Sequence, residues 1–121
     1  GAIRKVLLAW QTPTFIDEYF KTIIIHDQAF PHVRPDDLRG ELKRIRQEGY
    51  AITRGEYVND AVGIGAPVFN SEGELAGSIG IIAPEIRIDT PELLATQRDL
   101  VQFYASALSS DLGYEKHDVF Q

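Results

Sequence analysis

The sequence predicts a single mixed domain of the α/β (α+β) type, in which helices flank a small, partial antiparallel sheet. Apolar residues recur at helical spacing in three segments before residue 49 and again over residues 91–112. Two segments between them, residues 61–69 and 74–84, are rich in aliphatic residues and glycine and have the length of strands. The chain has 121 residues, of which 44% are hydrophobic and 25% charged, and this suffices for one ordinary domain with its own core.

The first two helices are predicted from their spacing and from one cap. Residues 3–10 are expected to form a short amphipathic helix. Thr12 and Pro13 then supply an N-cap and a first helical residue for a second helix. The residues expected to face the core from this second helix are Phe15, Ile16, Tyr19, Phe20, Ile23 and Ile24.

A third helix is expected from Pro35 to the residue before Gly49, because proline favours the first helical position and glycine the position after the last. Residues 27–34 form the connection before it. Residues 50–53 are predicted to be a short strand, followed by a polar loop. The core residues expected from the third helix are Leu38, Leu42 and Ile45.

The final helix has the same start as the second. Thr90, Pro91 and Glu92 combine a cap, a proline and an acidic first turn, and Gly113 closes a helix predicted over residues 91–112. Residues 115–121 are expected to fray. The residues expected to face inward are Leu93, Leu94, Leu100, Val101, Tyr104 and Leu108.

A hairpin of residues 61–69 and 74–84 is the centre of the predicted sheet, with residues 70–73 as its turn. The predicted register places Val68 opposite Leu75, and Val62 opposite Ile81. One face of the hairpin is then mostly aliphatic and the other mostly glycine, alanine and serine; a slip by one residue would mix the two sets. Glycine within a strand often marks close approach of a ligand or of another backbone, so the bare face either borders a hollow or receives another element.

Composition excludes several classes of function. The net charge is −6, and the basic stretch of residues 34–46 is interrupted by carboxylates, so direct DNA contact by this chain is not expected. The absence of cysteine excludes disulfides and thiolate metal sites. No apolar run approaches the length of a membrane span. The chain has no methionine, and we expect it to be a piece of a longer protein.

No set of residues predicts catalysis, so we expect no enzyme, no metal and no cofactor. His26, His32 and His117 are scattered without the spacing of metal ligands. Glu56 and Asp60 share a polar loop, and paired carboxylates can act in acid–base catalysis. A solvated loop explains the same pair.

Four stretches of the chain resemble the C-terminal effector-binding domain of IclR-type transcriptional regulators. They read RKVLLA, LRGELKRIRQEGYAITRGE, IGAPVFNSEGELAGSIGIIAP and LGY, at residues 4–9, 38–56, 64–84 and 112–114. The resemblance implies a GAF-like fold. It also implies that residues 1–121 are a partial effector-binding domain, without the upstream winged helix-turn-helix DNA-binding domain and without the first strands.

The resemblance implies the ligand-sensing domain of a bacterial transcriptional regulator. A small organic acid or aromatic effector would modulate DNA binding by the full-length protein in the cytoplasm. The regulator would self-associate as a dimer or tetramer, and DNA would be contacted only through a domain absent from this chain. The alternative is an oligomerisation module with no functional ligand site, whose bare face is filled by a partner chain.

The family's effector pocket can be carried over by position. Relatives that sense glyoxylate or pyruvate place a carboxylate-capable side chain, a cysteine and two serines where this chain has less polar residues. The expected pocket is therefore roomier and more apolar, suited to an aromatic or longer acid. Two further departures are Arg4 and Asp60, each in place of glycine, and Arg4 could supply a cation to an acid. The residues carried over as effector-binding are Ile3, Thr53, Ala61, Gly63, Gly80 and Ile82.

Overall fold

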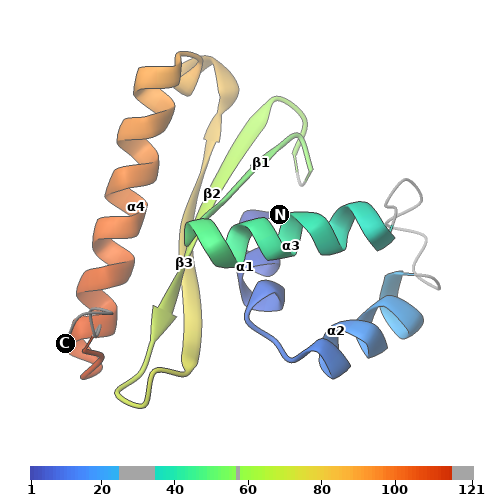
Figure 1. Ribbon diagram of the computed structural model, residues 1–121. Coiled ribbons are helices and arrows are strands. Elements are labelled where there is room, and N and C mark those ends of the chain that lie inside the picture. Colours follow the sequence, from blue (N-terminus) through green and yellow to red (C-terminus); the bar gives the residue numbers. More distant parts are fainter. Residues whose placement is uncertain (25–34, 57, 116–121) are drawn as a thin grey trace.

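The computed structural model describes residues 1–24, 35–56 and 58–115. The fold has three layers, with one long helix on one face of a small sheet and the other helices on the opposite face (Figure 1). The mixed α and β class predicted from the sequence is confirmed. In chain order the elements are α1 (Ala2–Ala9), α2 (Pro13–Tyr19), the π-helical turn η1 (Phe20–Ile24), α3 (Pro35–Glu48), β1 (Ala51–Arg54), β2 (Ala61–Phe69), β3 (Leu75–Pro84), the 3-10 turn η2 (Glu85–Ile88) and α4 (Pro91–Asp111).

The start of α2 confirms the predicted cap, because the Thr12 hydroxyl accepts a hydrogen bond from the Phe15 N–H at 3.1 Å. The inward face predicted for this helix is partly wrong. Phe15 is 51% exposed, whereas Phe20 in the following π-helical turn is buried. Ile16 and Tyr19 of this helix are partly buried and pack against the core, as predicted. The predicted connection at residues 27–34 and the side chains of Ile23 and Ile24 lie outside the described part of the chain.

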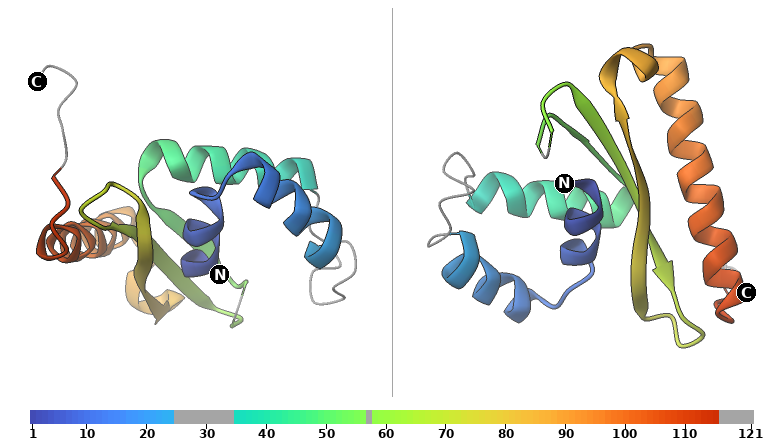
Figure 2. Two further views of the ribbon diagram at one scale, coloured as in Figure 1. Left: turned by 90° about the horizontal axis from the view of Figure 1, so that it is seen from below. Right: turned by 180° about the vertical axis from the view of Figure 1, so that it is seen from behind.

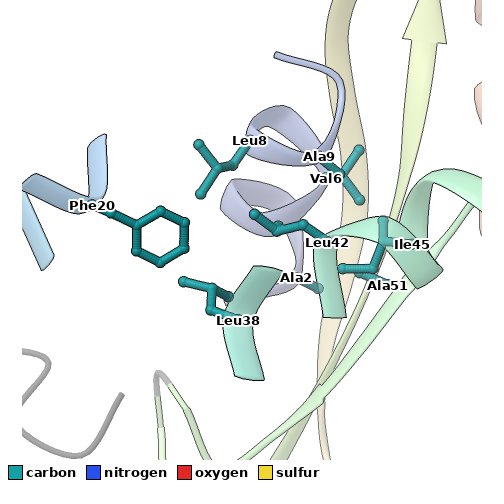
Figure 3. Packing of buried hydrophobic residues seen from close by; sticks show 9 residues of the cluster. All are labelled: Ala2, Val6, Leu8, Ala9, Phe20, Leu38, Leu42, Ile45 and Ala51. Carbon is teal, nitrogen blue, oxygen red and sulfur yellow. The ribbon is translucent and has the colours of Figure 1, made fainter. Parts of the chain in front are cut away.

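The first core lies between α1, α3 and the sheet (Figure 3). Gly49 has a φ of +83° and ends α3, as predicted from its position. Leu38, Leu42 and Ile45 are buried, which confirms the narrow apolar stripe expected on α3. The other buried members of this cluster are Ala2, Val6, Leu8, Ala9, Phe20 and Ala51.

The sheet has strand order β1-β2-β3 and is antiparallel throughout. The bounds of the hairpin agree with the prediction to within one residue. The predicted register is wrong by two residues, since Val62 pairs with Ala83 and Ile64 with Ile81. One residue of the shift comes from a longer turn. The other comes from a bulge, because Phe69 pairs with Leu75 and Val68 with Gly77, which leaves Ala76 unpaired.

A shift of two residues leaves every side chain beyond the bulge on its predicted face. The aliphatic face of the hairpin contributes Val62, Ile64, Ala66 and Val68 to a second core beneath α4. The opposite face is called the small-residue face below. It consists of Ala51, Thr53, Ala61, Gly63, Gly65, Pro67, Ser78, Gly80 and Ile82, and it lies toward α1.

Ser109 ties α4 to the hairpin at the bulge. Its buried hydroxyl accepts a hydrogen bond from the Phe69 N–H at 2.9 Å and donates to the Ala105 carbonyl at 2.8 Å. We expect Ser109→Ala to lower the free energy of unfolding by about 2 kcal/mol, because the Phe69 N–H loses its acceptor. Ser110→Ala, on the exposed side of the same turn, should change it by less than about 0.5 kcal/mol. Denaturant unfolding tests the pair, and equal effects would contradict the assigned role.

The inward face predicted for α4 is largely wrong. The residues that contact the second core are Leu94, Val101, Ala105 and Ser109. Four exposed residues each lie one position before one of these, so the two stripes have the same spacing and the period alone does not distinguish them. The residues wrongly expected inside are Leu93, Leu100, Tyr104 and Leu108, which are 44%, 45%, 58% and 42% exposed.

The end of α4 follows the prediction. Gly113 has a φ of +91°, and its N–H donates to the Ser110 carbonyl at 2.9 Å. Of the expected frayed tail, residues 116–121 lie outside the described chain. Among the described helices, none combines the length and apolar character needed to cross a membrane.

Candidate functional site

The first turn of α1 lies directly on the small-residue face. A Cβ on Gly65 would lie 3.1 Å from the Ala2 carbonyl carbon. A Cβ on Gly80 would overlap the Ile64 carbonyl oxygen and lie 3.0 Å from Ile3 Cγ1. The Ser78 hydroxyl donates to the Ile3 carbonyl at 3.1 Å and fixes the helix to β3. At Gly65 and Gly80, the glycines therefore allow a helix to approach the sheet.

A pocket of about 470 Å³ opens beside this contact. It lies between the first turn of α1, the small-residue face and the loop between β1 and β2; Figure 2 shows that loop beside the start of the chain. Most of its lining is apolar. The lining residues are Gly1, Ala2, Ile3, Arg4, Thr53, Glu56, Val58, Ala61, Gly63, Ile81 and Ile82.

The structure brings most of the predicted site residues together. Ile3, Thr53, Ala61, Gly63 and Ile82 all line the pocket. Gly80 is the exception, because it lies on the same face of the sheet but beneath Ile3. Its place outside the lining follows from the packing of α1 onto the strands.

Three aliphatic side chains at the pocket are exposed to solvent. Ile3 is 40% exposed, Val58 is 50% exposed and Ile82 is 58% exposed. Covering such surface with an apolar ligand is favourable by about 25 cal/mol per Å². Val58 was missed in the sequence because residues 54–60 were interpreted as a polar loop, although an aliphatic residue within such a loop is a usable signal.

Thr53 supplies a polar group in the wall formed by the sheet. The residue is only 6% exposed, yet its hydroxyl has no hydrogen-bond partner among the residues that the structure describes. The hydroxyl oxygen would lie 2.9 Å from a Cβ on Gly63, so the glycine leaves the space in front of it. A ligand in the pocket can therefore bond to this hydroxyl.

A cluster of three charged side chains flanks the pocket. The Lys5 ammonium group donates to both Glu41 oxygens, at 2.9 and 3.0 Å, and to Glu56 Oε2 at 2.5 Å. Lys5 thus joins α1 to α3 and to the β1–β2 loop. Sequence reasoning missed the cluster because Lys5 lies 36 residues from Glu41 and 51 from Glu56.

The β1–β2 loop is closed by backbone hydrogen bonds at both ends. The Gly55 N–H donates to the Ala61 carbonyl at 2.9 Å, and the Glu85 N–H donates to the Asp60 carbonyl at 2.7 Å. Asp60 has a φ of +61°, in the left-handed region that glycine adopts at least cost. This conformation explains why glycine suits the position and shows that aspartate still fits it.

The acid–base chemistry at the site is limited. Glu56 contacts Lys5, and Asp60 lies at the far end of the loop, so the two carboxylates serve different structural contacts. Burial lowers the pKa of the Gly1 amino group from its ordinary value, although the Glu56 carboxylate opposes this shift. Within the described residues no group of histidine, aspartate and glutamate side chains could hold a metal ion, and the three histidines lie outside that part of the chain.

Relatives with curated names are transcriptional regulators. RhmR of Escherichia coli K12 is 35% identical over 91 residues, which is 74% of this chain and 35% of RhmR. KipR of Bacillus subtilis 168 is 30% identical over 115 residues, which is 94% of this chain and 46% of KipR. RhmR is named an uncharacterized HTH-type transcriptional regulator, and KipR an HTH-type transcriptional regulator. The chain thus spans less than half the length of these relatives.

Solved structures share the fold. The IclR protein of Thermotoga maritima superposes with a TM-score of 0.80 at 26% identity, over 93% of this chain and 46% of that one. The C-terminal domain of E. coli KdgR superposes with a TM-score of 0.79 at 24% identity, over 93% of this chain and 69% of that domain. Residues 1–110 also match the family described as bacterial transcriptional regulator IclR, C-terminal. The chain therefore belongs to the IclR family of bacterial transcriptional regulators and corresponds to its C-terminal domain.

Proposed function

We propose that this chain is the part of a cytoplasmic transcriptional regulator that senses a small organic acid, aromatic or longer than three carbons, in the pocket beside α1. The observation that carries the proposal is the pocket itself. Its volume of about 470 Å³ lies within the range of small-molecule sites, about 300–1,000 Å³. It also contains exposed aliphatic side chains and an unpartnered hydroxyl, which a ligand would cover and satisfy.

The lining indicates how such an acid would be held. Ile3, Val58 and Ile82 would cover its hydrocarbon part. Arg4 lines the same pocket and carries the positive charge that attracts a carboxylate. The Thr53 hydroxyl would donate to or accept from a polar group of the ligand.

Binding becomes a signal only if the acid binds one state of the regulator more tightly than another. The first turn of α1 is fixed by Ser78 and by close packing on Gly65 and Gly80. The β1–β2 loop lines the pocket through Glu56 and Val58, and among the described residues its side-chain polar contacts to the start of the chain come from Glu56. The loop is thus the element we expect to close over the acid and to transmit binding to a DNA-binding domain elsewhere in the full-length protein.

A thermal-shift screen of the full-length regulator against a panel of aliphatic and aromatic carboxylic acids tests the proposal. We expect at least one aromatic or longer acid to raise the melting temperature, with tighter binding than glyoxylate by isothermal titration. Hydrogen exchange in residues 54–60 should slow when that acid is bound. Tight glyoxylate binding without any binding of larger acids would contradict the proposed ligand class.

The exposed stripe on α4 supports a further part of the proposal. We propose that the chain is a partial effector-binding domain, and that segments outside it cover Leu93, Leu100, Tyr104 and Leu108. The stripe is too apolar for a helix face that stays in water. The chain also spans only 69% of the KdgR C-terminal domain. DNA contact would then depend on a separate domain of the full-length protein.

The same stripe favours the second candidate, an oligomerisation module, because a second copy of the chain could cover it instead. Light scattering distinguishes the two. If segments of the same regulator cover the stripe, Tyr104→Glu should destabilise the full-length protein without a selective change in its oligomeric state. Selective dissociation into smaller, folded species would favour the oligomerisation module.

A further inference from the structure

We propose that Glu56 determines the specificity of the pocket by accepting a hydrogen bond from the effector. The pocket would then select a carboxylic acid that also carries a donor, a hydroxyl or an ammonium group, over the corresponding hydrocarbon acid. This inference rests on the proposed function, because it concerns the ligand of the same pocket.

The Lys5 cluster holds Glu56 in place without neutralising it. One ammonium group is shared by two carboxylates, so the three side chains together carry a formal charge of −1. Two of the three donor contacts go to Glu41, which is on α3 and outside the pocket lining. Glu56 is the carboxylate that remains at the pocket, with 36% of its side chain exposed.

The two oxygens of Glu56 have different surroundings. Oε2 accepts from Lys5, whereas Oε1 lies 3.8 Å from the Gly1 nitrogen, beyond hydrogen-bond distance. A carboxylate oxygen has two lone pairs, so Oε1 can accept from a ligand while Oε2 stays bonded to Lys5. Lys5 acts here as a positioning residue, because it fixes the direction in which Oε1 is presented.

A hydrocarbon acid in this pocket would remove water from Oε1 and offer no hydrogen bond in return. Loss of water from a carboxylate oxygen that gains no hydrogen bond opposes binding. A ligand hydroxyl or ammonium group would replace that water. The Thr53 hydroxyl gives a second, independent indication in the same direction, because it lines the same pocket and has no partner among the described residues. Two polar groups at one pocket favour a ligand that carries a further polar group in addition to its carboxylate.

Matched acids test the inference on the full-length regulator by isothermal titration. Mandelate has one hydroxyl that phenylacetate lacks, and gluconate has hydroxyls along a carbon chain that carries none in hexanoate. Within each pair the ligand charge is constant, so repulsion by Glu56 acts on both members. We expect the hydroxylated member to bind about tenfold more tightly in at least one pair.

The variants are Glu56→Leu, Glu56→Gln and the control Glu41→Leu. Glu56→Leu should remove the preference and Glu56→Gln should weaken it, since the amide keeps one acceptor but loses the charge. Glu41→Leu removes the other partner of Lys5 and should keep the preference, because Glu41 does not line the pocket.

Each other outcome overturns the inference in a recognisable way. Equal binding within both pairs by the unsubstituted protein would show that the pocket binds acids but that Glu56 does not select them. Loss of the preference in Glu41→Leu as well would assign it to the charge cluster, not to direct contact. Binding of none of these acids, nor of any in the wider panel, would refute the proposed function itself.

Discussion

Replacing Gly80 with alanine is expected to lower the free energy of unfolding by about 3 kcal/mol. The added Cβ would overlap the Ile64 carbonyl oxygen and lie 3.0 Å from Ile3 Cγ1 and 3.2 Å from Gly65 Cα. Two of these three neighbours are backbone atoms of β2, which cannot move aside without breaking the pairing of the strands. The substitution should therefore strain the hairpin and push α1 away from the sheet. Chemical denaturation followed by circular dichroism measures the effect.

Gly77→Ala is the matched control on the same strand. A Cβ at Gly77 would meet no atom within 4 Å, so the change should be neutral or slightly stabilising. A comparable decrease in the free energy of unfolding for the two variants would show that alanine is disfavoured along β3 in general. In that case close packing of α1 on Gly80 would not explain the need for glycine.

Replacing Gly63 with valine is expected to weaken binding of the tightest acid at least about a hundredfold, or about 2.7 kcal/mol. The isopropyl group would occupy the pocket floor, where a Cβ already lies 2.9 Å from Thr53 Oγ1 and 3.5 Å from Ala2 Cβ. Both of these atoms belong to side chains and not to the strand backbone. The substitution should therefore disturb the strand pairing less than a substitution at Gly80. Isothermal titration of the full-length regulator measures the loss.

Ala61→Leu provides a second way to fill the pocket, in case Gly63→Val unfolds the protein. Ala61 lines the pocket and is only partly buried, so a larger side chain can be placed there with little strain. Gly77→Val, on the other face of the hairpin, should leave the affinity unchanged. Unchanged affinity in both pocket variants would place the acid elsewhere.

Features determined by neighbouring residues could be predicted from the sequence. Thr12 and Thr90 cap their helices, and Gly49 and Gly113 end theirs, because each interaction depends on residues within one turn. The separation of the hairpin into two faces also survived the error in register. The bulge at Ala76 and the longer turn each shift the strand pairing by one residue. A total shift of two residues leaves each side chain on the same face of the hairpin.

Features determined by distant contacts could not be predicted. Leu93 and Leu94 begin two apolar stripes of equal spacing on α4, and only the position of the sheet decides which is buried. Gly80 resembles Gly63 in the sequence, yet α1 covers the one and leaves the other at the pocket. Lys5 meets its partners only after α1 packs against α3.

A structure of the full-length regulator bound to the tightest acid of the panel would show whether the pocket beside α1 is the effector site. We expect the acid to lie between Ile3, Val58 and Ile82, within hydrogen-bond distance of the Thr53 hydroxyl. An acid bound elsewhere, for instance in the groove that Trp10, Phe69 and Tyr114 line near α4, with the pocket beside α1 vacant, would contradict it.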